Sequence, residues 1–278
     1  MDRMPLGISR LDSMIGGGAP AGSVVLLAGE SGAGAREFAY TSTVMNGLAH
    51  TDEDRFDRFY GSLESDATLP EEVHYVTFTS EPGAVETEMR FVMDDEIVTA
   101  GTEDVNFRDL SREYFQLTPV PTDWYAERPT DITDLGTRTD RQDVLEALGD
   151  YLTENAPGNL VVIDSVTDLI AAAGEHLDWG DLTVLLRGLN RASYRWGGVI
   201  LLLVTVESLS PIQRGQLTEA ADGTLSFEWE SGGSERARTL VVDQFRGVLS
   251  RLEDEQIVRF ETEIHDGGFD ISNVRKIR

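Results

Sequence analysis

The amino-acid sequence predicts an α/β protein with a mostly parallel central sheet flanked by helices, and with antiparallel hairpins added at its C-terminal end. Short apolar runs alternate with helical patterns over the first two thirds of the chain, an order typical of parallel strands joined by crossover helices. The last third contains strand patterns separated by turn residues, which predict hairpins that extend one edge of the sheet. With 278 residues, 40% of them hydrophobic, the chain can bury a full core.

The expected strands are short apolar runs bounded by turn or polar residues. The first opens with Val24 and Val25, and the most apolar one begins at Val199. The turn signal Gly232-Gly233 separates two strands that we expect to pair as a hairpin. The expected strands lie at 24–27, 73–78, 114–117, 160–163, 199–204, 224–230, 238–245, 257–260 and 267–271.

The expected helices show apolar residues at helical spacing or residues that favour a helix start. Apolar residues between Leu6 and Ile15 predict a short turn or helix, which the glycines at 16–18 end. Pro82 marks the start of one helix, and Asp140 and Asp143 occupy the cap and capping-box positions of another. The longer expected helices lie at 36–47, 84–93, 140–155 and 177–196.

We expect a single domain over residues 1–278, without internal repeats. Two polar stretches, 48–72 and 94–140, show no clear periodicity, apart from the short strand expected in the second. We interpret both as loop-rich insertions into the domain.

The composition is strongly acidic. The chain has 50 Asp and Glu residues, 23 Lys and Arg residues and a formal charge of -27, and Lys276 is its single lysine. Such a surface resembles that of cytoplasmic proteins from salt-in halophiles, because high salt screens the repulsion between carboxylates. We therefore expect a cytoplasmic protein; an acidic surface directed at a basic partner is the alternative explanation.

The composition also argues against several classes of function. Unaided binding to nucleic acid is not expected, because it requires Lys or Arg at the phosphates. The chain contains no cysteine, so we expect neither a disulfide nor a thiolate metal site. It shows no signal-like apolar run and no apolar stretch of about 18 residues, so we expect no membrane insertion.

A glycine-rich turn between the first strand and the first long helix is the main candidate site. Gly29 and Gly34 match the two glycines of the phosphate-loop motif G-x-x-x-x-G-K-[ST]. Ala35, however, stands in the place of the lysine, and Arg36 in the place of the hydroxyl that binds magnesium. The candidate nucleotide-binding residues are Gly29, Glu30, Ser31, Gly32, Ala33, Gly34, Ala35 and Arg36.

Further motifs follow one another along nearly the whole chain. They are G-I-S-R-L-D-S-M-I-G-G-G-A-P-A-G-S-V at 7–24, V-V-I-D-S at 161–165, E-A-A-D-G-T-L-S-F at 219–227, T-L-V-V-D-Q-F-R-G at 239–247 and F-E-T-E-I-H-D-G-G-F-D-I at 260–271. In their order and spacing they resemble the RecA-superfamily ATPases, most closely the KaiC-like or RadA-like branch. The resemblance implies a RecA-like fold, ATP and Mg²⁺ as cofactors, and a homo-oligomer, often a ring with nucleotides between subunits.

The resemblance also assigns roles to particular residues. Asp164 and Ser165 end the strand that resembles Walker B, where the aspartate contacts Mg²⁺ indirectly; a plain cap of the next helix is the alternative. Arg246 is the arginine of an R-G pair that, in the family, lies near the neighbouring subunit's nucleotide. Asp164 is thus the candidate metal residue, and Arg246 the candidate intersubunit residue.

Three positions that carry chemistry in this family differ here. The phosphate-binding lysine is replaced by Ala35. The glutamate pair that activates water, in V-T-F-E-E, is replaced by Thr79 and Ser80, with Glu81 one residue further on. Gln244 replaces a basic residue that reaches the neighbouring subunit. A general drift from lysine to arginine does not explain an alanine and a glutamine.

The sequence therefore predicts a non-catalytic or weakly nucleotide-binding KaiC-like protein that acts as a regulatory or assembly partner of another protein. One alternative is a divergent, active ATPase in which Arg36 and Glu81 take displaced roles, since a guanidinium can bind phosphate with two hydrogen bonds. Another alternative is a recombinase-like accessory protein in DNA repair that contacts DNA through a local arginine patch.

Overall fold

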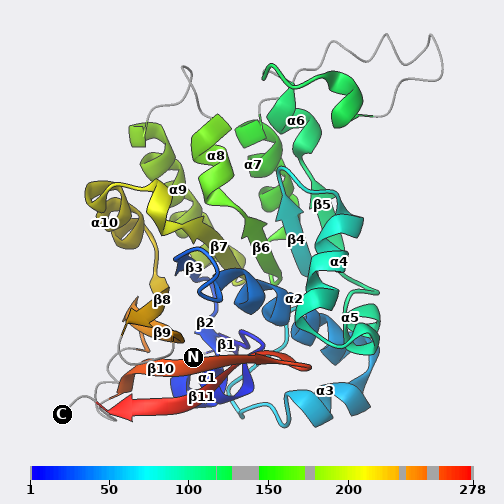
Figure 1. Cartoon of the computed structure of the whole chain (residues 1–278), viewed down its shortest axis with the longest axis vertical. Helices are drawn as coiled ribbons and strands as arrows, with labels where there is room; N and C mark the ends of the chain where they lie inside the picture. Colours follow the sequence, from blue (N-terminus) through cyan, green and yellow to red (C-terminus); the bar gives the residue numbers. More distant parts are fainter. Residues whose placement is uncertain are drawn as a thin grey trace.

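A central, mostly parallel sheet carries helices on both of its faces (Figure 1). The computed structural model describes residues 2–116, 118–126, 144–172, 179–231, 236–248 and 257–276. The strands of this sheet lie in the order β11 (Gly268–Lys276), β10 (Ile257–His265), β9 (Arg236–Phe245), β8 (Gly223–Ser231), β3 (Val24–Gly29), β7 (Val199–Thr205), β6 (Leu160–Asp164), β4 (Val73–Thr77) and β5 (Asn106–Asp109). Neighbours from β8 to β5 pair in parallel and those from β8 to β11 pair antiparallel, which confirms the predicted fold class.

The parallel strands are buried on both faces, and this explains why their sequences are continuous apolar runs. In β3, Val25 and Leu27 belong to one layer of the core, whereas Val24, Leu26 and Ala28 belong to the other. The residues of β6 and β7 alternate between the two layers in the same way. The helices must therefore cover two faces of the sheet rather than one.

Each face of the sheet has its own set of helices (Figure 1). The first set is α1 (Ser9–Ile15), α2 (Ala35–Thr51), α3 (Glu53–Phe59), α4 (Pro82–Val92) and α5 (Asp95–Gly101). The second set is α6 (Ser111–Phe115), α7 (Val144–Asn155), α8 (Val166–Ala172), α9 (Trp179–Trp196) and α10 (Pro211–Ala220). Two short strands, β1 (Arg3–Met4) and β2 (Ala19–Pro20), pair separately, and single 3-10 turns lie at η1 (Thr122–Trp124) and η3 (Val206–Ser208).

The longer helices lie where the sequence predicts them. α4 begins at Pro82, and the last residue of α9 is Trp196, as expected. α7 is described from Val144 onward, so the caps predicted at Asp140 and Asp143 lie outside the described residues. The predicted pairing of the two strands after residue 222 is also confirmed, because β8 and β9 pair antiparallel.

The loop-rich insertions are the part of the prediction that the structure corrects. Within 48–72, α2 continues to Thr51 and α3 follows directly. Within the described part of 94–140, α5 and β5 replace loop, and the first two residues of the strand expected at 114–117 are instead the end of α6, while residue 117 lies outside the described residues. These elements have four to seven residues each, too few for a helical or strand period to be recognised in the sequence.

The C-terminal hairpin of β10 and β11 packs beneath the start of α2. Phe269 of β11 lies edge-on to Phe38 of α2 and to Phe227 of β8, with ring centroids 5.4 and 5.7 Å away. The amide of Phe269 also donates to Thr41 Oγ1 at 2.8 Å. Segments from the last quarter of the chain therefore support the start of α2.

A buried carboxyl group fixes the N-terminal segment. Asp12 of α1 is fully buried and accepts hydrogen bonds from the amides of Leu6 and Gly7, at 2.9 and 3.0 Å, and from the hydroxyl of Tyr60 at 3.1 Å. Burial raises the pKa of Asp12 from 3.8 to about 7, although the hydrogen bonds from Leu6 and Tyr60 oppose the increase.

This carboxyl group makes stability depend on pH. Between about pH 4 and about pH 7 folded Asp12 holds a proton that the unfolded chain has lost, so stability falls as the pH rises, by at most about 4 kcal/mol. Urea unfolding between about pH 5 and about pH 8, in molar KCl to screen the other carboxylates, measures this trend. The Asp12→Asn variant should show a flatter profile. An Asp12→Asn profile that falls as steeply as that of the wild type would contradict the assignment.

Candidate functional site

The predicted glycine-rich turn joins the end of β3 to the first residue of α2 and borders an open cleft of about 450 Å³. Gly34, directly before α2, has φ 114°, and a Cβ atom there would lie 2.9 Å from the ring of Phe269. Only glycine fits such a position without strain. Of the predicted nucleotide-binding residues 29–36, all line this cleft except Ala33, which is buried.

An ion pair joins the two predicted motifs at the base of the cleft. Arg36 Nη2 donates to Asp164 Oδ1 at 3.0 Å, so the second residue of α2 reaches the end of β6. The other oxygen of the carboxylate, Asp164 Oδ2, accepts a hydrogen bond from the hydroxyl of Tyr75 in β4 at 2.7 Å. The side chain of Asp164 is 9% exposed, whereas that of Arg36 is 48% exposed.

A second carboxylate extends the network to α4. Glu88 Oε2 lies 3.9 Å from Arg36 Nη1 and accepts a hydrogen bond from the hydroxyl of Tyr40. Tyr40 is one helical turn beyond Arg36, so both side chains lie on the same face of α2. The guanidinium thus lies between two carboxylates, and each of them is held by a tyrosine.

The protonation states follow from this arrangement. Burial raises the pKa of Asp164, and Arg36 and Tyr75 lower it only in part. Burial lowers the pKa of Arg36, but the negative charges of Asp164 and Glu88 raise it by more than burial lowers it. The guanidinium therefore stays charged. The cation of Arg36 is therefore what allows a carboxylate to be charged at this depth.

The apex of the turn is held by side chains from other segments. The amide of Ser31 donates to Glu207 Oε1 at 2.6 Å, and the carbonyl of Ser31 accepts from the indole of Trp229 at 3.1 Å. Arg238 lies over the Trp229 ring and donates to the carbonyl of Gly32 at 3.0 Å. The carboxylate of Glu207 thus accepts the hydrogen bond of the Ser31 amide, and in a phosphate loop such an amide is available to a bound anion.

The charges around the cleft are mostly negative. Among the charged residues that line it in the described part of the chain, Arg36 is the one cation, and the acids are Glu30, Glu37 and Glu88. Glu207 adds a further carboxylate at the apex; burial acts to raise its pKa, but the hydrogen bond from the Ser31 amide lowers it overall. This arrangement repels a polyphosphate rather than attracting one.

The other predicted site residues fall into two groups. Ser165 donates to Asp168 Oδ2 at 2.7 Å and accepts from the amide of Asp168, so it acts as a cap before α8, whereas Asp164 pairs with Arg36, which lines the cleft. Glu81 is exposed at the cap position of α4 and does not line the cleft. The structure therefore brings Asp164 to the glycine-rich turn and leaves Ser165 and Glu81 outside it.

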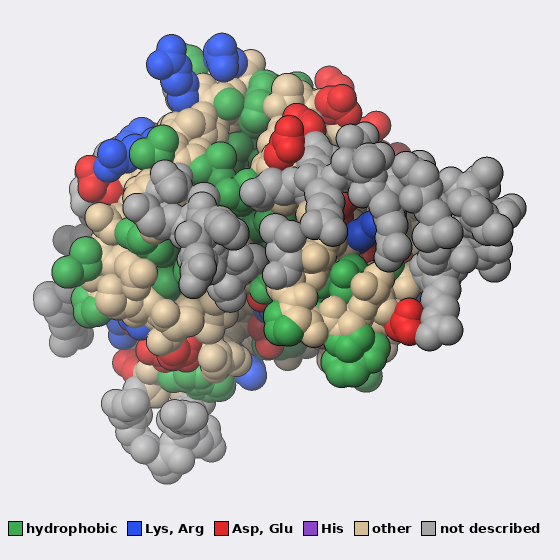
Figure 2. All heavy atoms as spheres, turned by 90° about the horizontal axis from the view of Figure 1, so that it is seen from above, with side chains coloured by type: hydrophobic (Ala, Val, Ile, Leu, Met, Phe, Trp, Pro, Cys, Tyr) green, Lys and Arg blue, Asp and Glu red, His purple; other side chains and the backbone are tan. Residues whose placement is uncertain are grey.

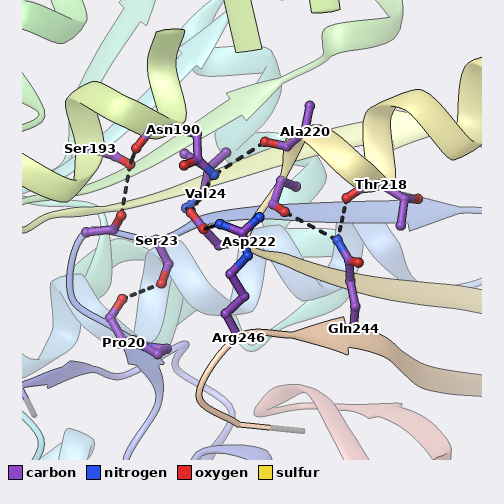
Figure 3. Close-up of polar contacts among 12 residues, drawn as sticks. Pro20, Ser23, Val24, Asn190, Ser193, Thr218, Ala220, Asp222, Gln244 and Arg246 are labelled. Carbon is purple, nitrogen blue, oxygen red and sulfur yellow. Dashed lines mark hydrogen bonds and ion pairs between the residues drawn. The ribbon is translucent and has the colours of Figure 1, made fainter. Parts of the chain in front are cut away.

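Arg246 and Gln244 have partners within the chain, at the opposite end of β3 from the turn (Figure 3). Arg246 Nη1 pairs with Asp222 Oδ1 at 3.0 Å, with its side chain 70% exposed. Asp222 Oδ2 accepts from the amide of Val24 at 3.1 Å and from Asn190 Nδ2 at 2.7 Å. Gln244 Nε2 donates to the carbonyls of Thr218 and Ala221. These contacts tie β8, β9 and α9 to the start of β3.

The sequence analysis missed residues that hold the turn or belong to the ion-pair network beside it. They are Tyr40, Tyr75, Glu88, Glu207, Trp229 and Arg238. Tyr40 carries a usable signal, because it follows Arg36 at a spacing of four residues on a helix. The others come from separate elements, and no local pattern marks them.

A second, apolar hollow of about 390 Å³ lies between α7, α8 and α9. Figure 2 is seen from the end that carries these helices and shows hydrophobic side chains at the surface between basic and acidic ones. Leu182 and Leu186 of α9 line the hollow together with Leu148 and Leu152 of α7. These four leucines are buried, whereas Leu185 of α9, which also lines the hollow, is 36% exposed, so the hollow brings an apolar side chain to the surface at its rim.

Comparison with protein-family models and with curated proteins finds no match for this chain. The resemblance to KaiC-like ATPases therefore rests on the motifs alone. In the part of the chain that the structure describes, no helix is long and apolar enough to cross a membrane, and no group of three or more His, Asp or Glu residues is arranged to hold a metal ion.

Proposed function

We propose that this protein is a non-catalytic relative of the KaiC-like ATPases that acts as a regulatory or assembly partner of another protein and binds nucleotide weakly or not at all. One observation carries the proposal: Arg36, at the position of the magnesium-binding hydroxyl, is paired with Asp164 at 3.0 Å. Arg36 thus stands where a hydroxyl would bind the metal, and its positive charge neutralises Asp164, the acid that would lie near the metal.

The other side chains that ATP hydrolysis requires in this family are also absent from the matching positions of this chain. Ala35 offers no ammonium group to the phosphates, and its side chain lies against Gly29. Thr79 and Ser80 offer no carboxylate to activate water at the end of β4. Asp164 Oδ1 accepts a hydrogen bond from the cation of Arg36, so a Mg²⁺ ion at this carboxylate, bound directly or through water, would meet a positive charge, and the residues present do not fit it.

The two alternatives receive less support from the geometry. A divergent ATPase would need Arg36 free to hold phosphate and Glu81 close to it, but Arg36 lies between two carboxylates and Glu81 lies outside the cleft. A DNA-repair accessory protein would need a basic surface. The cleft is acidic, and Arg187 of α9 pairs with Glu219 of α10.

The hollow between α7, α8 and α9 supports the expectation of a protein partner, because an apolar surface gains stability when it is covered. The acidic composition supports a cytoplasm with high salt as the place where the protein works. Homo-oligomerisation stays a prediction from the resemblance.

Equilibrium ATP binding in molar KCl with Mg²⁺, with phosphate release followed in the same samples, tests the proposal. We expect weak or undetectable binding and no phosphate release above the buffer, because the groups that bind and activate the reactants are absent. The Asp164→Asn variant is the control for contaminating ATPases. Phosphate release by the wild type that disappears in this variant would overturn the proposal.

A further inference from the structure

We infer that the guanidinium of Arg36 is a built-in replacement for a divalent cation at Asp164, so that this site is complete without a metal. The inference rests on the proposed function and deepens it. It concerns what Mg²⁺ can do at the cleft, and it holds whether or not ATP binds there.

The position of the charge is the first argument. Arg36 lies on the second residue of α2, directly after the glycine-rich turn, and its Nη2 atom lies 3.0 Å from Asp164 Oδ1. Its Nη1 atom lies 3.9 Å from Glu88 Oε2, so one planar cation serves two acids on different elements. A divalent cation that bridges carboxylates performs the same electrostatic task.

The occupancy of the acids is the second argument. Asp164 has one donor on each carboxylate oxygen, Arg36 on Oδ1 and Tyr75 on Oδ2. Mg²⁺ demands oxygen ligands in near-ideal octahedral geometry, at about 2.0–2.1 Å. A Mg²⁺ ion at this carboxylate, bound directly or through a water molecule, would lie beside the guanidinium of Arg36, and the two cations would repel each other.

The experiment moves the positive charge by one residue. The variant that combines Ala35→Lys with Arg36→Ser keeps the net charge and restores the family pattern of lysine followed by a hydroxyl. Ala35 lines the cleft, so a longer side chain at this position can extend into it. Thermal unfolding is followed in molar KCl with ATP, in millimolar MgCl₂ and in EDTA, for the wild type and the variant.

We expect the wild type to unfold at the same temperature in MgCl₂ and in EDTA. The double variant should unfold at a higher temperature in MgCl₂ than in EDTA, since its cleft accepts the metal with the nucleotide. Arg36→Lys keeps a cation at position 36 and should behave like the wild type. Arg90→Ser is the matched control, because Arg90 also pairs with two acids, Glu86 and Asp95, but outside the cleft.

A wild type stabilised by Mg²⁺ would overturn the inference, and so would a folded double variant without any response to Mg²⁺. If the double variant does not fold, the Arg36→Lys variant decides. An unfolding temperature that is the same in MgCl₂ and in EDTA supports the inference, and a clearly higher temperature in MgCl₂ overturns it. The proposed function is tested by phosphate release, and this inference is tested by the effect of Mg²⁺ on the unfolding temperature. The two failures are therefore distinguishable.

Discussion

Replacement of Arg36 by methionine is expected to lower the free energy of unfolding by about 2–3 kcal/mol. The change keeps most of the side-chain volume but leaves the buried carboxylate of Asp164 without its cation. Breaking a fully buried pair costs about 3–5 kcal/mol, and the half-exposed position of Arg36 reduces this value through solvent screening. Urea unfolding in molar KCl at neutral pH gives the measurement.

The pH dependence of the variant separates loss of charge from loss of packing. Burial already raises the pKa of Asp164, and removal of Arg36 raises it further. The folded state then binds a proton more readily than the unfolded state, so the loss of stability should shrink as the pH falls through the folded pKa of Asp164. A loss that does not change with pH would contradict the electrostatic explanation.

Two further variants complete the test of Arg36. Adding Asp164→Asn to Arg36→Met should cost less than the sum of the single changes, because the charge to be neutralised is then absent. Arg246→Met is the matched control, since Arg246 pairs with Asp222 at the same 3.0 Å but is 70% exposed. It should cost less than about 1 kcal/mol. Equal losses at the two arginines would show that the lower exposure of Arg36 is not decisive.

The fold could be predicted from the sequence because its signals are local and repeated. Runs such as Val199–Val204 have no polar residue, and only a strand covered on both faces buries them all. The failures come from the same cause. Helix α3 has one buried residue, Phe56, so burial leaves almost no trace in its sequence and the segment resembles a loop.

The site could be predicted only as far as it is local. The turn from Gly29 to Arg36 and the acid Asp164 each follow a strand, and parallel strands bring their carboxyl ends to one edge of the sheet. That Arg36 contacts Asp164 depends on distances across the fold. The contacts of Glu88 and Glu207 depend on how α4 and η3 pack, which no spacing in the sequence records.

The network around Arg36 requires α2 to be placed accurately, and a pair of glycines sets that position. Gly47 of α2 faces Gly101 at the end of α5, and a Cβ atom at Gly47 would lie 2.0 Å from the carbonyl oxygen of Gly101. In return, a Cβ atom at Gly101 would lie 2.5 Å from the carbonyl oxygen of Val44. Backbone atoms cannot move aside as side chains do, so the two helices must separate if either glycine gains a side chain.

Gly47→Ala is therefore expected to lower the free energy of unfolding by about 3 kcal/mol or more, despite the gain of up to about 1 kcal/mol in helix propensity. Gly149→Ala is the matched control, since it makes the same change in α7 at a position with no atom within 4 Å of the new Cβ. This variant should be more stable than the wild type by about 0.5–1 kcal/mol. Urea unfolding of both variants measures the change in the free energy of unfolding, which should be negative for Gly47→Ala and positive for Gly149→Ala. If Gly47→Ala also stabilises the protein, α2 and α5 do not approach as closely as described, and the placement of Arg36 beside Asp164 loses its structural basis.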